Sequence, residues 1–128
     1  MIVADTHAWL WWLSDDRRLS AAARRALESA RAVGVPAACC WEVAWLAATR
    51  KIELRPSPAE WLRKAVRFGN VALLPMTPDI AVRGATLGRA FCGDPGDRQI
   101  VGTALQHSAP LVTCDGKIRD SGLVETIW

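Results

Sequence analysis

The segment Met1-Ile-Val-Ala-Asp5-Thr-His-Ala8 decides how this chain of 128 residues is organised, because a short apolar run ends in an acid and a helix-like stretch follows. The same pattern returns near the other end of the chain, where Asp115 follows Leu111-Val-Thr-Cys114. Apolar, β-branched runs of this length predict buried strands. In a parallel sheet, ligands bind beyond the carboxyl ends of the strands, so both acids are candidates for a functional site.

Other short runs of the same kind alternate with longer amphipathic stretches. Three helix starts are indicated by Ser57-Pro58, Thr77-Pro78 and Asp94-Pro95, where a capping side chain precedes a proline at the first helical position. Strands separated by helices predict parallel pairing through right-handed crossovers. We therefore expect an α/β fold with three layers, α/β/α, around a central, mostly parallel sheet of four to five strands. The strand candidates are Ile2–Ala4, Val33–Ala37, Val71–Leu74, Leu111–Cys114 and Val124–Ile127.

The composition favours one globular domain over residues 1–128, with 51% hydrophobic and 23% charged residues. Asp5 and His7 interrupt the start before a signal peptide could form, and no run reaches the roughly 20 apolar residues of a membrane-spanning helix. We expect a soluble, cytoplasmic protein without a membrane partner. The cysteines form no C-x-x-C pair, which favours four small buried thiols over a zinc site or disulfides; they are Cys39, Cys40, Cys92 and Cys114.

The charge balance leaves nucleic-acid binding open. The formal net charge is only +3, and basic pairs such as Arg17-Arg18, Arg24-Arg25 and Arg63-Lys64 could contact phosphates. However, 13 of the 16 basic residues are arginine in an alanine-rich chain, and this excess can reflect codon composition alone.

Two more acids interrupt apolar or helix-starting sequence. Glu42 is the only charged residue between Ala37 and Ala48, and Asp97 lies at the front of a helix-like stretch. Taken singly, the aspartates have ordinary explanations as helix caps, dipole partners or turn residues. Glu42 differs, because we expect its helix to be buried on most sides, where an isolated carboxylate is costly unless it is paired or bound to a metal.

Acids that lie far apart in sequence, at the ends of strands and helices, can gather around a hard metal ion. Ligands that offer only oxygen favour Mg²⁺ or Mn²⁺ over zinc. We do not expect His7, in the first turn of its helix, or His107, near a helix end, to be ligands. The candidate acids, called the four acids below, are Asp5, Glu42, Asp97 and Asp115.

These segments together resemble the PIN-domain endoribonucleases, and specifically the VapC-type toxins of bacterial toxin–antitoxin pairs. The resemblance covers essentially the whole chain. Three departures, at Cys40, Arg50 and Cys92, remove no acid. The matching motifs are Asp5-Thr6-His7-Ala8 with Trp12, Trp41-Glu42-Val43-Ala44, Gly93-Asp-Pro-Gly-Asp-Arg98 with Thr103-Ala104, and Leu111-Val-Thr-Cys-Asp115.

The resemblance implies hydrolysis of RNA to 5′-phosphate and 3′-hydroxyl ends at a catalytic site built from the four acids. Asp5 and Asp97 would hold Mg²⁺ or Mn²⁺, while the other two acids would complete the metal's shell, directly or through water. The hydroxyls of Thr6 and Thr113 would orient the site, and Asp94 would be accessory. The resemblance also implies a VapB-like antitoxin that blocks the pocket with a basic side chain.

The seven tryptophans indicate a further surface. Trp9, Trp11 and Trp12 share one short predicted helix and cannot all point inward, since successive residues are about 100° apart. The excess rings favour a homodimer interface or a groove for the antitoxin, with stacking on unpaired bases as a further alternative.

Two other classes of function remain as alternatives. A PIN nuclease could process RNA without acting as a toxin. A non-catalytic, Mg²⁺-binding domain of the receiver type also has acids at strand ends, but it needs a pair of acids after the first strand, and Asp5-Thr6-His7 lacks that pair. A haloacid-type phosphatase would need a second acid where His7 stands.

Overall fold

The computed structural model describes residues 1–89 and 91–128, and the strands within them form one parallel sheet. β1 lies in the middle of the sheet, where Val3 pairs with Gly34 of β2 on one side and with Leu111 of β4 on the other. The strands are β1 (Ile2–Ala4), β2 (Val33–Pro36), β3 (Val71–Leu74), β4 (Leu111–Val112) and β5 (Thr126–Ile127), in the spatial order β3-β2-β1-β4-β5.

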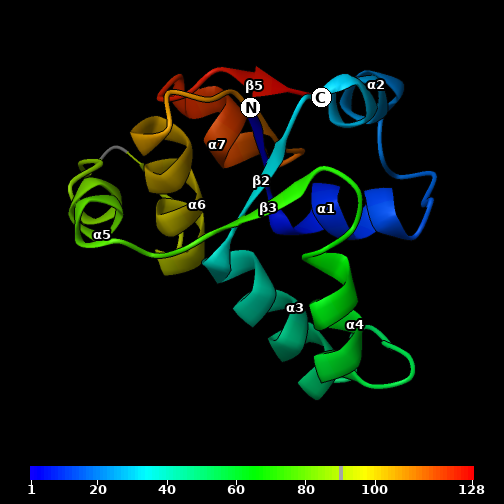
Figure 1. Cartoon of the computed structure of the whole chain (residues 1–128). Helices are drawn as coiled ribbons and strands as arrows, with labels where there is room; N and C mark the ends of the chain where they lie inside the picture. Colours follow the sequence, from blue (N-terminus) through cyan, green and yellow to red (C-terminus); the bar gives the residue numbers. More distant parts are fainter. Residues whose placement is uncertain (90) are drawn as a thin grey trace.

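Helices cover both faces of this sheet, which confirms the three-layer prediction. Figure 1 shows α5 and α6 on one side of the strands and α1 and α2 on the other. The order reverses after β3, so the chain crosses back over β2 and β1 to place β4. The helices are α1 (Thr6–Leu13), α2 (Ala21–Ser29), α3 (Ala37–Ala48), α4 (Pro58–Ala65), α5 (Pro78–Ala85), α6 (Pro95–Gln106) and α7 (Gly116–Ser121).

The predicted helix starts are confirmed in detail. The side chains of Ser57, Thr77 and Asp94 each accept a hydrogen bond from the backbone N–H three residues later, at 3.3, 3.3 and 2.9 Å. Each cap is followed by a proline at the first helical position. These starts were predictable because a cap and its helix are neighbours in sequence.

Three predicted strand ends are wrong by one or two residues. β2 stops at Pro36 because Ala37 already begins α3, and β4 stops at Val112 although the Thr113 N–H still donates to the Ile127 carbonyl at 3.2 Å. β5 begins only at Thr126. Both C-terminal strands are therefore two residues long, and the segment after β4 is free to turn into α7.

Helices α5 and α6 touch along their backbones, and this contact fixes the start of α6. A Cβ atom on Gly102 would lie 2.8 Å from the backbone nitrogen of Gly84, and one on Gly84 would lie 2.7 Å from the carbonyl oxygen of Arg98. Any larger side chain at these glycines would push the two helices apart. The close packing holds the first turn of α6, which carries Asp97, against the rest of the fold.

The core lies between the sheet and its helices and is filled by apolar side chains from both ends of the chain. Trp9 of α1 is fully buried and meets the ring of Trp61 of α4 edge-on, with centroids 5.8 Å apart. Cys39 is also buried, but Cys92 is exposed, so the prediction of four buried thiols is wrong. In the described part of the chain, no helix combines the length and the apolar character needed to cross a bilayer.

Candidate acidic site at the carboxyl ends of the central strands

The four acids, predicted from segments far apart in sequence, line one cavity of about 390 Å³. Asp5 follows β1 and Asp115 lies just beyond β4, so two of them stand at the carboxyl edge of neighbouring strands. Glu42 comes from the middle of α3 and Asp97 from the first turn of α6. The predicted accessory residues Thr6 and Asp94 line the same cavity, together with His7, Trp11, Ile100, Cys114, Lys117 and Ile118.

Hydrogen bonds to helix starts hold three of the acids in place. Asp5 caps α1 by accepting from the Ala8 N–H at 2.7 Å, and Asp115 caps α7 by accepting from the Ile118 N–H at 3.1 Å. Asp97 and Asp94 form a capping box, in which each carboxylate accepts from the other residue's N–H, at 3.0 and 2.9 Å. These acids therefore cap helices and line the cavity at the same time, so the capping role does not exclude a role at the candidate site.

Two threonine hydroxyls connect the acids across elements. The Thr6 hydroxyl of α1 donates to Oε2 of Glu42 in α3 at 2.5 Å. The Thr113 hydroxyl is hydrogen-bonded to the carboxylate of Asp5 and accepts from the N–H of Asp115 at 3.0 Å. Both threonines are buried, so these links are shielded from water and fix the relative positions of the acids.

The cavity disfavours negative charge on its own acids. Burial raises the pKa of Asp5, although hydrogen bonds from Thr113 and Ala8 and the nearby His7 oppose the rise, and Glu42 adds to it. Burial also raises the pKa of Asp97, and the neighbouring acids Asp94, Asp115 and Glu42 raise it further. Like charges gathered in a poorly solvated place favour either a proton or a bound cation.

The residues present fit a hard divalent cation, because the donors are carboxylate and hydroxyl oxygens. In the described residues, however, no group of three histidine, cysteine, aspartate or glutamate side chains is arranged closely enough to hold an ion. The carboxylates of Asp5, Asp97 and Asp115 are instead engaged by backbone N–H groups three residues away, at the starts of their helices. The site thus has the chemistry of a metal centre without a closed cage of ligands.

The prediction that α3 is buried on most sides is wrong. Trp41 and Trp45 are 66% and 53% exposed, and their rings stack with centroids 5.6 Å apart and planes at 8°. The buried residues of this helix are Cys39 and Val43. Glu42 is half-buried and has the Thr6 hydroxyl as its partner, so it is not the isolated buried charge that its apolar neighbours in sequence indicated.

Sequence reasoning missed several residues of the cavity wall. His7 was correctly placed in the first turn of its helix and rejected as a metal ligand, but its ring lines the cavity and tilts against Trp11, with centroids 5.4 Å apart. Lys117 lines the cavity from α7. His7 lies two residues after the capping residue Asp5, and Lys117 lies two residues after the capping residue Asp115. This shared spacing is a sequence signal that could have drawn attention to both residues.

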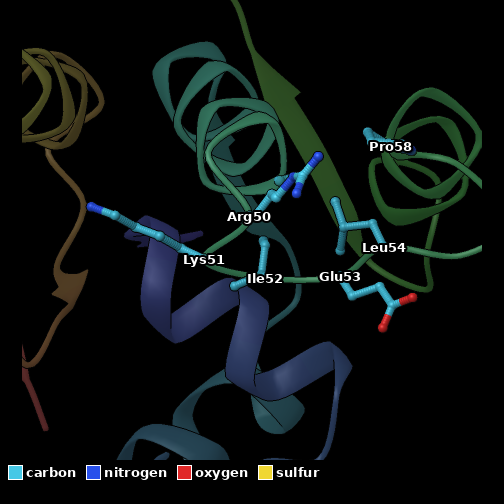
Figure 2. A pocket seen from close by; sticks show the side chains of 7 residues that line it. Arg50, Lys51, Ile52, Glu53, Leu54 and Pro58 are labelled. Carbon is cyan, nitrogen blue, oxygen red and sulfur yellow. The ribbon is translucent and has the colours of Figure 1, made fainter.

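A second hollow, of about 450 Å³, lies in the segment between α3 and α4 and has a different character. Figure 2 shows Arg50, Lys51 and Glu53 among the side chains that line it. Glu53 is the single carboxylate of its described lining, and it forms an ion pair with Arg55 at 2.8 Å. The gathering of acids therefore distinguishes the first cavity from this one.

The family is shown by two independent similarities. The PIN domain family matches residues 2–122. The chain belongs to the PIN-domain family. It is also 36% identical over 118 residues to Ribonuclease VapC22 of Mycobacterium tuberculosis, a match that spans 92% of this chain and 89% of that protein. Within the family, this places the chain among the VapC ribonucleases and confirms the resemblance found in the sequence.

Solved structures support the fold. The chain superposes on VapC20 of Mycobacterium tuberculosis, described as a toxin that cleaves the sarcin-ricin loop, with a TM-score of 0.73, 18% identity and 98% of both chains covered. It superposes on VapBC2 of Rickettsia felis, bound to a promoter DNA fragment, with a TM-score of 0.72, 12% identity and coverage of 98% and 97%. At these identities the likeness concerns the fold.

Proposed function

We propose that this protein is a Mg²⁺- or Mn²⁺-dependent endoribonuclease and the toxin of a VapBC-type pair, acting in the cytoplasm. The observation that carries the proposal is the meeting of the four acids in one cavity, at the carboxyl ends of β1 and β4. Family membership supports it, since the relative with 36% identity is a ribonuclease.

The four acids, the two threonines and Asp94 each have a defined part in this proposal. Asp5 and Asp97 would hold the cation, and Glu42 and Asp115 would complete its surroundings directly or through water. A divalent ion bound there supplies a Lewis acid and lowers the pKa of a coordinated water. Thr6 keeps the Glu42 carboxylate oriented, and Thr113 fixes the position of Asp5 relative to Asp115. Asp94 acts indirectly, because its capping box holds Asp97.

The direct test measures cleavage of RNA by purified protein with Mg²⁺. Asp5→Asn is the informative change, because asparagine can still cap α1 but offers no charge to a cation. We expect cleavage to fall to the background of the assay, with ends carrying 5′-phosphate and 3′-hydroxyl in the wild-type reaction only. Asp79→Asn, an exposed acid in the first turn of α5, is the matched control and keeps full activity. Full activity of Asp5→Asn would remove Asp5 from the mechanism.

The toxin role separates this proposal from a processing nuclease. A VapB-like antitoxin is expected to place a basic side chain in the acidic cavity. Related folds occur in a toxin–antitoxin complex from Klebsiella pneumoniae and in VapBC2 of Rickettsia felis. Induction of the gene alone should arrest growth, and a neighbouring small gene should relieve the arrest. Normal growth under induction, with active protein present, would favour the processing role.

A second copy of the chain is the proposed occupant of the exposed face of α3. Trp41, Trp45 and Met76 line a hollow of about 740 Å³ that shares Glu42 and Asp94 with the acidic cavity. Exposed apolar side chains that gather in this way mark interaction surfaces. A homodimer formed there would border the catalytic cavity of each subunit.

A further inference from the structure

Lys117 stands apart from the other residues of the acidic cavity. Among the described residues that line it, Lys117 is the one lysine or arginine, and it faces a wall that holds the four acids and Asp94. It lies in the first turn of α7, two residues after Asp115, and its side chain is exposed. The catalytic proposal assigns no part to this residue.

The position of Lys117 does not depend on an ion pair. In the described part of the chain, the ion pairs join Arg18, Arg24 and Arg55 to nearby acids, and Lys117 takes part in none of them. The backbone of α7 is held instead by the cap from Asp115 and by Ile118, which is 1% exposed. Lys117 therefore lines the cavity with an exposed side chain that no ion pair among the described residues engages.

The chemistry of the substrate indicates what that ligand is. RNA carries a negative phosphate at every nucleotide, and a wall of carboxylates repels all of them. A cation at the four acids would offset the charge of the phosphate that is cleaved, but the adjoining phosphates need another positive group. A lysine suits this task, since its ammonium is a compact charge with three donors on a flexible stem.

Resting on the proposed ribonuclease function, we propose that Lys117 binds a backbone phosphate next to the cleaved bond and thereby positions the RNA strand in the cavity. Lys117 is then a substrate-binding residue that affects binding of RNA more than the chemical step. The competing explanation is internal: Lys117 could only offset the mutual repulsion of the carboxylates in the metal-free protein.

The first experiment measures kcat and KM for an RNA oligonucleotide at several salt concentrations. Lys117→Ala should raise KM roughly five- to tenfold with little change in kcat, and should reduce the slope of log affinity against log salt by about 0.7, the value of one contact to a single strand. Lys117→Arg should restore most of the affinity. The matched control is Lys51→Ala, an exposed lysine in the hollow of Figure 2, and it should match wild type. An unchanged KM and slope for Lys117→Ala overturn the proposal.

The second experiment separates this proposal from the ribonuclease function itself. Binding of a labelled oligonucleotide is measured by fluorescence anisotropy in the Asp5→Asn background, with and without Lys117→Ala. If affinity falls with Lys117→Ala while the wild-type protein cleaves nothing, the phosphate contact stands and the ribonuclease function fails. If affinity is unchanged or absent in both proteins, the phosphate contact fails. Lower thermal stability of Lys117→Ala in metal-free buffer, with unchanged affinity for RNA, identifies the internal role and also overturns the proposal.

Discussion

Helices α1 and α3 have a similar apolar composition and very different surroundings. Both are strongly apolar, THAWLWWL and AACCWEVAWLAA, and both directly follow a strand of the parallel sheet. In α1 the ring of Trp9 is fully buried and is met by Trp61 of α4. In α3 the stacked rings of Trp41 and Trp45 lie open to solvent. An apolar sequence thus indicates that a helix has a face to bury. Whether other elements of the same chain pack against that face depends on the topology.

The two helices are connected beside the acidic cavity, at the carboxyl ends of the central strands. The hydrogen bond from Thr6 to Glu42 joins the first turn of α1 to the middle of α3, beside the acidic cavity. The covered helix therefore holds Glu42, the acid that the uncovered helix contributes to the cavity. Changes in either helix can be sorted by whether they act on the core, on this link or on the open face.

The largest effect on stability should come from the covered helix. Trp9→Ala should lower the free energy of unfolding by about 3–5 kcal/mol, because it leaves a cavity in the core. The matched variant Trp9→Phe should cost much less, since the indole Nε1 is buried without a hydrogen-bond partner in the described structure and its loss removes an unsatisfied donor. Urea denaturation followed by circular dichroism measures both changes. Equal losses for the two variants would contradict the account.

A smaller loss is expected at the link between the helices. Thr6→Val keeps the shape of the side chain but removes the donor to Glu42, and should cost roughly 1.5–3 kcal/mol, the range for a hydrogen bond to a charged group. Thr86→Val is the control, because its exposed hydroxyl bonds to carbonyls of its own helix and, among the described residues, to no other element. We expect cleavage of RNA to fall with Thr6→Val and not with Thr86→Val. A Thr6→Val protein with wild-type stability would show that the link contributes nothing.

The next prediction concerns pH, and here the substitution should stabilise the protein instead of destabilising it. Burial raises the pKa of Asp5 above its ordinary value of 3.8, so the folded state binds the proton more tightly than the unfolded state. The resulting stability is present below the ordinary pKa and is lost as pH rises through the raised one. In metal-free buffer at neutral pH, Asp5→Asn should therefore unfold at a higher temperature than wild type.

The gain from Asp5→Asn should shrink as the buffer is made acidic. Added Mg²⁺ should raise the unfolding temperature of wild type more than that of the variant, because a bound cation stabilises only the state that holds it. Calorimetry at several pH values, with and without Mg²⁺, checks both statements. A variant that is less stable than wild type at every pH would show that the Asp5 charge is already well accommodated.

The smallest effect on folding is expected at the open face of α3. Trp41→Ala and Trp45→Ala should change the stability of the monomer by no more than about 0.5 kcal/mol, because the rings are already exposed. Their effect should appear in association instead, as a shift from dimer to monomer in analytical ultracentrifugation. Phe68→Ala, a 54% exposed aromatic elsewhere, should leave association unchanged. An intact dimer in both tryptophan variants would assign the face to another partner.

Local signals in the sequence predicted the helix starts and the acids, and nonlocal packing accounts for what was missed. Ser57, Thr77 and Asp94 could be recognised as caps because each bonds to a residue three positions away. The surroundings of Glu42 could not be deduced, since apolar neighbours in sequence do not reveal which face of a helix the fold covers. His7 and Lys117 each lie two residues after a capping aspartate, but this local spacing alone does not show that both line one cavity. Their places in the cavity depend on the sheet order, which brings β1 beside β4.

The sheet order also governs when the protein can become active during its synthesis. The ribosome makes β1 well before β4, yet β4 fills one flank of β1 in the sheet. Thr113 and Asp115 are made long after Asp5, so a nascent chain that ends before β4 lacks part of the proposed catalytic site. On the proposed function, truncated chains that lack β4 and Asp115 should not cleave RNA, so incomplete products should not harm the cell that makes them.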